Sequence, residues 1–537
     1  MPSERCDVLV IGSGPSGAIV THTLASRGFD VVCLEQGDWV NPSDFPANQP
    51  EWELLCEHAW AHDPNQRKLP ADYPLDVSAS DLTPVMFSAV GGASLFYGAH
   101  WLRLLPSDFR LRSLDGICDD WPISYDDLKP YHDEVDKFIG ASGLEGDPAY
   151  PEGLTYPRPP HPPGPTGLRG AAAANELGWH WWPGANAIAV NKTKTLEPCA
   201  RRGTCEWGCP EGAKSSFDLI YMPQALQAGA KLIHGARVRE VTTEPGGLAD
   251  GAIWLDRDGV EHHQRARVVV LCANGIGTPR LLLLSGGEAH PDGLANSSGL
   301  VGRNLMLHPN CLVTGYYDDA MESWLGPAGQ LIHSMEFYET RPEHDFPRGC
   351  KLHLVPIPGP LTTINVHREL PFDAVWGDSF HGVAARHAGS MLWAANTEDL
   401  PEESNRIVLD PDLTDDLGVS APKVEYQISE DNWKILRFAV ERMEELHRVA
   451  GAAETFAVEL DEDQPGHLLG TARMGDDPAS SVVDSFGRSH DVPNLFIADG
   501  SVFVTGGSVN PTCTIAAIAL RVGTHIAETA DRQPIPS

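Results

Sequence analysis

The chain has few basic residues for its length. Lysine and arginine number 39 against 74 aspartate and glutamate residues, so the formal net charge of the 537 residues is −35 at pH 7. Such a charge opposes binding to nucleic acid or to an anionic membrane through a general electrostatic field. The composition therefore predicts no nucleic-acid partner and no membrane partner, although the charge would attract a cationic substrate.

Cysteines and long apolar runs are also scarce. Eleven cysteines are too few for a disulfide scaffold, and Cys33 and Cys272 stand within apolar stretches. No apolar run approaches the roughly 20 residues that cross a bilayer. Residues 1–6 show no cationic segment followed by an apolar one, so no signal peptide is visible. We therefore expect a cytoplasmic protein in a reducing compartment, and its length predicts two or more domains.

A glycine-rich motif near the N-terminus predicts a dinucleotide-binding unit. The apolar run at residues 8–11 predicts a buried parallel strand that leads into Gly12, Gly14 and Gly17, and residues 16–26 follow with a helical pattern. Gly12 permits the tight turn, Gly14 lets the backbone approach a pyrophosphate, and Gly17 lets the helix pack on the strand. Strand, glycines and helix together are a specific pattern, whereas G-x-G-x-x-G alone is weak.

The second strand of this unit ends on a carboxylate. Residues 30–34 predict the strand, and Glu35 follows 18 residues after the last glycine of the motif. A carboxylate there can accept hydrogen bonds from ribose hydroxyls. The helix N-terminus, with Ser13, Pro15 and Ser16 in the turn, offers unpaired N–H groups to phosphates. These residues predict a dinucleotide, with FAD and NAD both open at this point.

Three later stretches indicate the same domain. The adjacent Gly91 and Gly92 in an apolar stretch indicate close approach of the backbone to a flat or phosphorylated group, or else a plain glycine turn. Residues 268–271 repeat the pattern of a buried strand before a glycine turn, and residues 280–284 predict the start of a helix. Residues 494–498 predict a last strand, and residues 510–512 begin a helix with proline at its first position.

The middle of the chain predicts a second domain. Residues 312–458 alternate apolar and polar positions, as in an antiparallel sheet with one exposed face, and residues 433–449 predict an amphipathic helix. The proline-rich residues 144–167 are interpreted as an extended spacer, neither helix nor central strand. The expected fold class is α/β, with a Rossmann-like doubly wound dinucleotide-binding domain plus an α+β substrate domain built on a mostly antiparallel sheet.

Three cysteines fall close together in a Cys-x5-Cys-x3-Cys-Pro stretch. Cys199, Cys205 and Cys209 could ligate an iron–sulfur cluster as thiolates, but the usual complement is four and no CxxC pair is present. We favour a structural role for these thiols in a tight loop. No metal site is predicted.

Five separated stretches resemble the glucose–methanol–choline (GMC) oxidoreductases, which are FAD-dependent enzymes that oxidise alcohols. They are residues 8–35, 90–97, 278–286, 466–475 and 494–526. The resemblance implies FAD rather than NAD, and it is nearest to the bacterial pyranose and glycoside oxidases, of the C-glycoside 3-oxidase type. It implies a FAD-binding domain in three parts, at residues 1–160, 199–311 and 465–537. Residues 161–198 would form a spacer with a segment of the substrate domain, and residues 312–464 would form the substrate-binding domain.

The resemblance also implies a catalytic pair. The sequence around His467 matches the catalytic-histidine stretch of the family, and Asn510 stands where the family has His or Asn. His467 would accept the hydroxyl proton as a hydride passes to flavin N5, and Asn510 would orient the hydroxyl oxygen. His308, His490 and His525 have no such support and are interpreted as structural.

The expected cofactor is non-covalent FAD. Some relatives tether FAD through a histidine after the glycine pair, but Leu95, Phe96 and Tyr97 occupy that region here. The residues expected to bind FAD are Gly12, Ser13, Gly14, Pro15, Ser16, Gly17, Glu35, Gly91, Gly92, Ser94, Val238, Asp499, Gly500, Asn510, Pro511 and Thr512.

The reaction implied by the resemblance is oxidation of a secondary hydroxyl of a sugar or glycoside to a keto-sugar, with oxygen or a quinone as electron acceptor. An amino sugar, a sterol or another alcohol is an alternative substrate, and a flavoprotein without alcohol oxidation, such as a lyase, is the alternative class. The oligomeric state is left open. Side chains in the second domain that could contact a sugar are Trp376, Trp393, His353, Asn365, Arg386 and Asn396.

Overall fold

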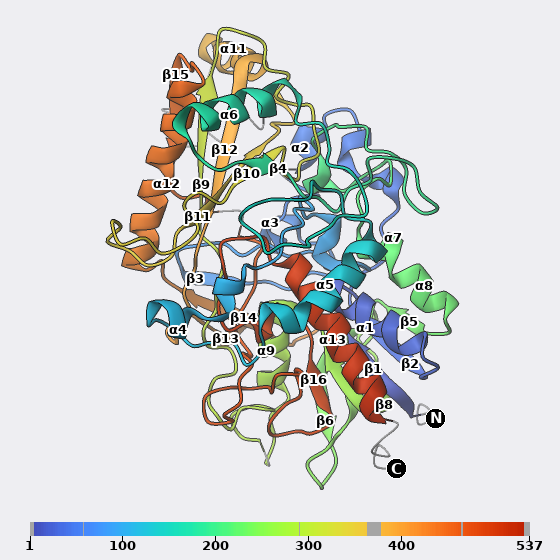
Figure 1. Ribbon diagram of the computed structural model, residues 1–537. Helices are drawn as coiled ribbons and strands as arrows, with labels where there is room; N and C mark the ends of the chain where they lie inside the picture. Colours follow the sequence, from blue (N-terminus) through green and yellow to red (C-terminus); the bar gives the residue numbers. More distant parts are fainter. Residues whose placement is uncertain (1–4, 57, 289, 362–376, 463–464, 531–537) are drawn as a thin grey trace.

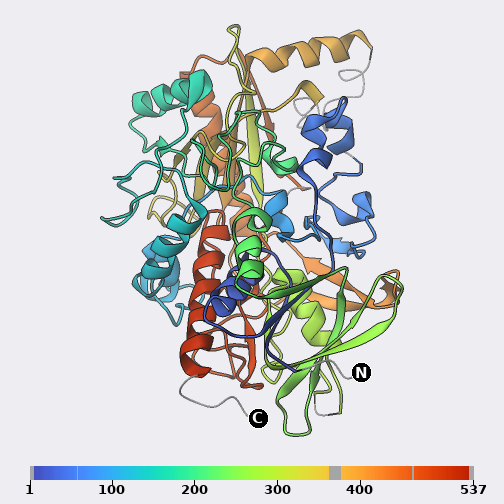
Figure 2. The ribbon, with the colours of Figure 1, turned by 90° about the vertical axis from the view of Figure 1, so that its right-hand side faces the viewer.

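The protein was analysed as a computed structural model that describes residues 5–56, 58–288, 290–361, 377–462 and 465–530. Within these residues the strands form three sheets. The largest of these sheets lies in the lower half of the molecule in Figures 1 and 2, and the second large sheet lies above it.

The lower sheet has seven strands and contains the N-terminal glycine motif. Its members are β1 (Cys6–Ile11), β2 (Val31–Glu35), β5 (Lys231–His234), β6 (Arg237–Thr243), β7 (Ala249–Leu255), β8 (Glu261–Leu271) and β16 (Leu495–Ile497). The order is β5-β2-β1-β8-β7-β6, and β16 also pairs with β8. The pairs among β5, β2, β1, β8 and β16 are parallel, whereas β6 and β7 are antiparallel. This confirms the predicted doubly wound sheet with buried parallel strands.

Three helices pack in series beside this sheet. They are α1 (Pro15–Ala25), α5 (Tyr125–Ile139) and α13 (Thr512–Ala530). Helix α1 packs against α13, and α13 packs against α5, so the first and last helices of the chain lie side by side (Figure 1). The helix that starts at the first glycine motif and the helix that starts after Asn510 are thus parts of one layer.

The upper sheet is antiparallel throughout. Its order is β15 (Glu454–Val458), β9 (Asn310–Tyr316), β12 (Ser390–Thr397), β11 (Cys350–Val355), β10 (Ile332–Ser334) and β4 (Trp182–Pro183). Helix α12 (Glu430–Val449) packs on β9, β12 and β15, and α6 (Gly164–Leu177) packs on α12. This confirms the predicted antiparallel sheet and amphipathic helix.

A third sheet connects the two larger ones. It consists of β13 (Arg406–Thr414), β14 (Ser420–Tyr426) and β3 (Asp76–Ser80), with β14 antiparallel to β13 and parallel to β3. Helix α9 (Asn274–Leu284) packs against β6 of the lower sheet and against β13 and β14. Strand β14, which was expected in the antiparallel substrate sheet, therefore belongs to a separate sheet.

The other helices within the described residues are short. The α-helices are α2 (Trp52–Cys56), α3 (Pro64–Arg67), α4 (Leu111–Asp115), α7 (Phe217–Ile220), α8 (Met222–Gln227) and α11 (Asp378–Ala385). The 3₁₀ helices are η1 (Pro42–Asp44), η2 (Pro46–Asn48), η3 (Gly92–Leu95), η4 (Pro106–Phe109), η5 (Cys205–Trp207), η7 (Arg386–Gly389) and η8 (Gly500–Val502).

Two expectations about helices are wrong at their boundaries. The spacer was expected to be non-helical through residue 167, but α6 begins at Gly164. Pro165 is tolerated because it lies in the first turn, where backbone N–H groups have no intrahelical partner. Helix α9 was expected to begin at Arg280, after the proline. It begins at Asn274, whose side-chain Oδ1 accepts hydrogen bonds from the backbone N–H groups of the next turn.

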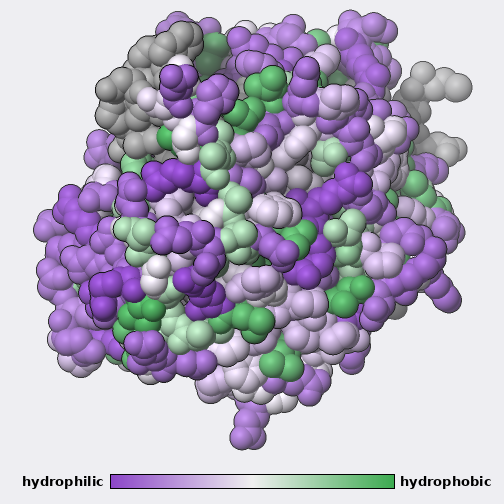
Figure 3. All heavy atoms as spheres, turned by 90° about the horizontal axis from the view of Figure 1, so that it is seen from above, coloured by the Kyte–Doolittle hydropathy of each residue, from purple (hydrophilic) through white to green (hydrophobic). Residues whose placement is uncertain are grey.

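The face of the molecule seen from above is mainly hydrophilic (Figure 3). Apolar side chains form small separate groups on this face. Among the described residues, no helix has the length and apolar character required to cross a membrane. The division of the chain into five segments stays a prediction.

Candidate active site

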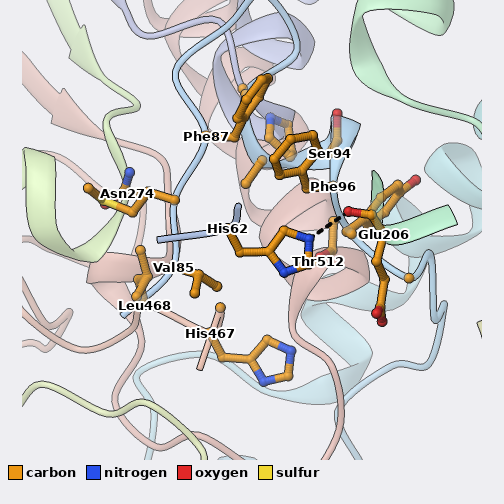
Figure 4. Close-up of a pocket in the computed structure, with 18 of the residues that line it drawn as sticks. His62, Val85, Phe87, Ser94, Phe96, Glu206, Asn274, His467, Leu468 and Thr512 are labelled. Carbon is orange, nitrogen blue, oxygen red and sulfur yellow. Dashed lines mark hydrogen bonds between the residues drawn. The ribbon is translucent and has the colours of Figure 1, made fainter. Parts of the chain in front are cut away.

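One cavity of about 720 Å³ is lined by residues from both large sheets. This volume lies within the range of cofactor and ligand sites. The glycine turn after β1 lines the cavity together with His467 and Asn510. Figure 4 shows part of this lining, where Phe87, Phe96, His62 and His467 come from separate segments of the chain.

Glu35 forms a buried carboxylate site at the end of β2. Its Oε2 accepts hydrogen bonds from the Ser13 backbone N–H at 2.9 Å and from the Ser13 hydroxyl at 2.8 Å. The Gly37 N–H donates to Oε1 at 2.9 Å. Burial raises the pKa of Glu35 above its ordinary value, and these hydrogen bonds oppose the shift. The carboxylate is therefore held in one orientation at the cavity, where it can accept hydrogen bonds from hydroxyl groups.

The glycines of the two loops are required by close approach. A Cβ on Gly17 would lie 1.9 Å from the Gly12 carbonyl oxygen, and a Cβ on Gly12 would lie 2.4 Å from the Cys272 carbonyl oxygen. The second loop approaches the first, since a Cβ on Gly92 would lie 2.8 Å from the Cα of Gly14. Two backbones without side chains thus form a narrow cradle of the kind that a pyrophosphate needs.

Asp499 connects the end of β16 to the start of α9. Its Oδ2 accepts hydrogen bonds from the Asn274 N–H at 3.0 Å and from the Thr278 hydroxyl at 2.6 Å. Its Oδ1 accepts the N–H and the hydroxyl of Ser501 at 2.9 and 2.5 Å. Asp499 lines the cavity near the N-terminus of α13, so a second helix end also faces this space.

Most of the residues predicted to bind FAD line this cavity. They are Gly12, Gly14, Pro15, Ser16, Glu35, Gly92, Ser94, Val238, Asp499, Gly500, Asn510, Pro511 and Thr512. Ser13, Gly17 and Gly91 lie directly behind the lining, where the Gly91 N–H donates to the Ser13 carbonyl at 3.1 Å. The backbone N–H groups at the helix N-termini, the buried carboxylate of Glu35, which can bind ribose hydroxyls, and the cradle of the two glycine loops all fit FAD. Their individual roles stay a prediction.

The two predicted catalytic residues meet in the same cavity. The side-chain Nδ2 of Asn510 lies 3.1 Å from Nε2 of His467. His467 stands in a loop that is fixed on both sides, because the Val85 N–H donates to the Pro465 carbonyl at 3.0 Å before it, and Leu469 exchanges two backbone hydrogen bonds with Met306 at 3.1 Å after it. The pair is therefore preorganised in the folded chain.

His308 contacts the other ring nitrogen of His467. The two Nδ1 atoms are 2.9 Å apart, and His308 is fully buried. Burial chiefly lowers the pKa of His467 well below its ordinary value, and His308, Lys351 and His100 lower it further. His467 is therefore neutral at physiological pH and can accept a proton.

Lys351 and Asn396 lie on the opposite side of Asn510. Lys351 Nζ donates to Asn510 Oδ1 at 2.7 Å, and Asn396 Nδ2 donates to the same oxygen at 3.4 Å. Lys351 Nζ also lies 3.4 Å from Nδ1 of His100. Among the described residues no carboxylate forms an ion pair with Lys351, and its burial lowers its pKa well below the ordinary value.

Four of the six suggested sugar contacts lie within the described residues, and two of these four line the cavity. They are His353 and Asn396. Trp393 is fully buried on the other face of its strand, and Arg386 pairs with Glu454 at 2.6 Å instead. Trp376 and Asn365 lie outside the described residues.

Sequence reasoning missed the groups that surround the pair. His308 was interpreted as structural, but it contacts His467. One signal is visible only in the backbone: His308 has φ +53° immediately before Pro309, and a non-glycine residue in this region is typical of functional sites. His490 bonds Ser481 and His525 stacks on Phe486, and neither lines the cavity.

Known proteins identify the family of this chain. Residues 9–310 and residues 401–519 match the two models described as GMC oxidoreductase. The chain belongs to the GMC oxidoreductase family. FAD is the cofactor of this family, so this GMC oxidoreductase is a FAD-binding flavoprotein that acts on a small-molecule hydroxyl substrate.

Three curated relatives extend over nearly the whole chain. The 2-methyl-1,2-propanediol dehydrogenase of Mycolicibacterium austroafricanum is 41% identical, over 100% of this chain and 98% of the relative. The fructose dehydrogenase large subunit of Gluconobacter japonicus is 30% identical, over 97% of both chains. The paromamine 6′-oxidase of Streptomyces fradiae is 30% identical, over 97% of this chain and 91% of the relative. The expected likeness to glycoside 3-oxidases in particular is therefore not specifically supported.

Solved structures show the same fold. A formate oxidase of Aspergillus oryzae superposes with a TM-score of 0.67 at 16% identity, covering 99% of this chain and 100% of the other. Pyridoxine 4-oxidase from Mesorbium loti superposes with a TM-score of 0.66 at 16% identity, covering 97% of this chain and 99% of the other. This likeness confirms the fold class of a Rossmann-like FAD domain with a substrate domain.

The cysteine cluster forms part of a loop beside the cavity. Cys199 Sγ accepts the Arg201 N–H at 3.3 Å, and Cys209 Sγ accepts the Ala213 N–H at 3.2 Å. Burial raises the pKa of Cys199 to about 11, so its thiol is protonated at neutral pH. Their structural role stays a prediction.

Proposed function

We propose that this GMC oxidoreductase oxidises a hydroxyl that has a second hydroxyl on the neighbouring carbon. Small 1,2-diols contain this grouping, and so do the sugars and glycosides that the sequence resemblance favours. The observation that carries the proposal is the His467–Asn510 pair, whose nitrogens lie 3.1 Å apart on the cavity. In sugars the reacting group would be a secondary ring hydroxyl, and the product a keto-sugar.

The pair has complementary roles at one hydroxyl group. His467 Nε2 accepts the hydroxyl proton, and Asn510 Nδ2 donates to the oxygen and orients it. Bound FAD supplies the acceptor for the hydride that leaves the carbon. The low pKa of His467 keeps its ring neutral, so that it can accept a proton, and the contact with Nδ1 of His308 holds the ring in its orientation. Oxygen or a quinone is the electron acceptor that we propose.

The face of the upper sheet suggests how the rest of the substrate is held. Nearest to Asn510, Asn310, Asn396 and Lys351 stand side by side on β9, β12 and β11. On the same face, two rows farther from Lys351, Leu392 lies opposite Val355. A polar row beside the reacting group suits a second hydroxyl, and this apolar pair farther out suits alkyl groups. A small branched diol fits this gradient better than a fully hydroxylated sugar.

Anaerobic reduction of the bound flavin tests this proposal. We expect 2-methyl-1,2-propanediol and 1,2-propanediol to bleach the flavin, because the second hydroxyl can bond Asn310 or Asn396. The matched substrate is 2-methyl-1-propanol, which has the same carbon skeleton without that hydroxyl, and we expect it to react much more slowly. Equal rates for the two alcohols contradict the diol proposal. Bleaching by fructose or a methyl glycoside alone favours the sugar.

An amino sugar is the second candidate, and Glu206 supports it. Glu206 lines the cavity, and burial with the nearby charge of Asp461 raises its pKa to about 7 (Figure 4). An ammonium group of a substrate would pair with this carboxylate. Glu206→Gln is expected to raise the KM for an amino sugar and to leave the KM for a neutral diol unchanged. Equal effects on both substrates would argue against an ammonium subsite.

A further inference from the structure

The hydrogen bonds around Asn510 have a fixed direction. Lys351 Nζ has N–H groups to donate both as an ammonium group and as the neutral amine that its burial favours, and it lies 2.7 Å from Oδ1 of Asn510. If the amide were turned over, its NH₂ group would face the N–H groups of both Lys351 and Asn396, so the atom that faces Lys351 is Oδ1. Asn396 Nδ2, at 3.4 Å from the same oxygen, imposes the same orientation.

This orientation determines which nitrogen of His467 carries the proton. With Oδ1 held by Lys351, Nδ2 of Asn510 points at Nε2 of His467 at 3.1 Å. An amide NH₂ group can only donate, so Nε2 must be the unprotonated nitrogen of the neutral ring. The proton then resides on Nδ1, which donates to Nδ1 of His308 at 2.9 Å.

We propose that Lys351 is a positioning residue that sets the tautomer of His467 through the amide of Asn510. It does not touch the reacting hydroxyl. By holding Oδ1 it directs both the Asn510 donor and the His467 lone pair to the position where a hydroxyl group can bind. In this series Lys351 donates to Asn510, Asn510 donates to His467, and His467 donates to His308.

The position of Lys351 supports this role over a purely structural one. Its side chain is fully buried, and among the described residues it has no ion pair that would explain the burial of an ammonium group. Another buried lysine, Lys214, shows the contrast. Its Nζ donates to the backbone carbonyls of Leu95 and Cys205 at 2.6 Å and touches neither residue of the pair. Lys214 is therefore a matched buried lysine whose hydrogen bonds within the described residues go to backbone carbonyls.

The proposal rests on His467 being the base, and its test does not need a known substrate. FAD-loaded protein labelled with ¹⁵N-histidine gives ring-nitrogen shifts that distinguish a protonated from an unprotonated Nε2, and the His467→Gln variant assigns the His467 signals. In the wild type we expect unprotonated Nε2. In Lys351→Met we expect a mixture of tautomers, because the amide of Asn510 can then turn over. Lys214→Met is expected to keep the wild-type tautomer.

Kinetics and chemical rescue complete the test. Once a substrate is known, Lys351→Met should lower the rate constant of flavin reduction by up to about 100-fold, the effect of a misplaced catalytic group. In the Lys351→Ala variant, propylammonium is expected to restore the tautomer, which keeps the test valid if the methionine variant unfolds. A wild-type tautomer in folded Lys351→Met protein overturns the proposal. Absence of any alcohol oxidation by the wild type overturns the proposed function instead.

Discussion

Nδ1 of His308 lies 2.9 Å from Nδ1 of His467, and the two residues are 159 positions apart in the chain. Since Nε2 of His467 faces Asn510, the Nδ1 proton is directed at His308. Burial, with the neighbouring Lys351, lowers the pKa of His308 to about 3, so His308 stays neutral and can accept this hydrogen bond. The base of the pair is thus oriented by a second histidine.

His308→Ala removes the acceptor for the Nδ1 proton of His467. We expect the rate constant of flavin reduction to fall by about 10- to 100-fold, because the ring loses its fixed orientation. Rapid-mixing absorbance at saturating substrate measures this rate. His490→Ala, whose ring bonds Ser481 away from the cavity, is the control and should retain the wild-type rate. If both variants behave alike, His308 does not orient the base.

The two members of the predicted pair are expected to differ in importance. His467→Ala should bind FAD normally and lose flavin reduction by about 10²–10⁴-fold, the contribution of a positioned general base. Asn510→Ala should lose less, because the base remains when the orienting donor is removed. Rates of anaerobic bleaching measure both. A His467→Ala variant that is reduced at the wild-type rate would show that another group is the base.

The pH dependence should reflect the low pKa of His467. The ordinary value for histidine is 6.5, and burial lowers the pKa of His467 well below it. The base works when neutral, so the reduction rate at saturating substrate should stay constant as pH falls from about 8 through 6.5, and it should decline only at lower pH. A titration with a midpoint near 6.5 contradicts this expectation.

Gly17 tests the packing under the dinucleotide cradle. A Cβ at Gly17 would lie 1.9 Å from a backbone oxygen, so Gly17→Ala must displace α1 from β1. We expect a loss of about 1–3 kcal/mol in the free energy of unfolding, and weaker FAD binding. Gly246→Ala is the control, because a Cβ there has no neighbour within 4 Å. Thermal unfolding and the flavin content after gel filtration measure both effects.

FAD is expected to be released intact from denatured protein. Phe96 occupies the position where some relatives carry the tethering histidine, and its ring lies in an aromatic cluster with Phe87 at 3.9 Å between centroids. A phenyl ring cannot form a histidyl bond. After acid precipitation, the yellow colour should stay in the supernatant with one FAD per chain. Colour that remains with the pellet would demonstrate a covalent bond.

Local sequence determined the dinucleotide half of the site. The strand, three glycines, helix and terminal Glu35 stand at short fixed separations, and each step follows from backbone geometry that neighbouring residues impose. The structure places these elements as β1, α1 and β2, with the bounds shifted by two residues or less. The alternating pattern likewise predicted the antiparallel sheet. His467 and Asn510 were found through the resemblance to the family.

Tertiary structure alone decided what surrounds the catalytic pair. Lys351 stands 159 positions before Asn510, and His308 stands 159 positions before His467. An alternating strand shows that Lys351 and His353 share a face, but it does not say which layer covers that face. Contacts between buried polar groups depend on how two sheets and a loop come together, and no local period in the sequence records that arrangement.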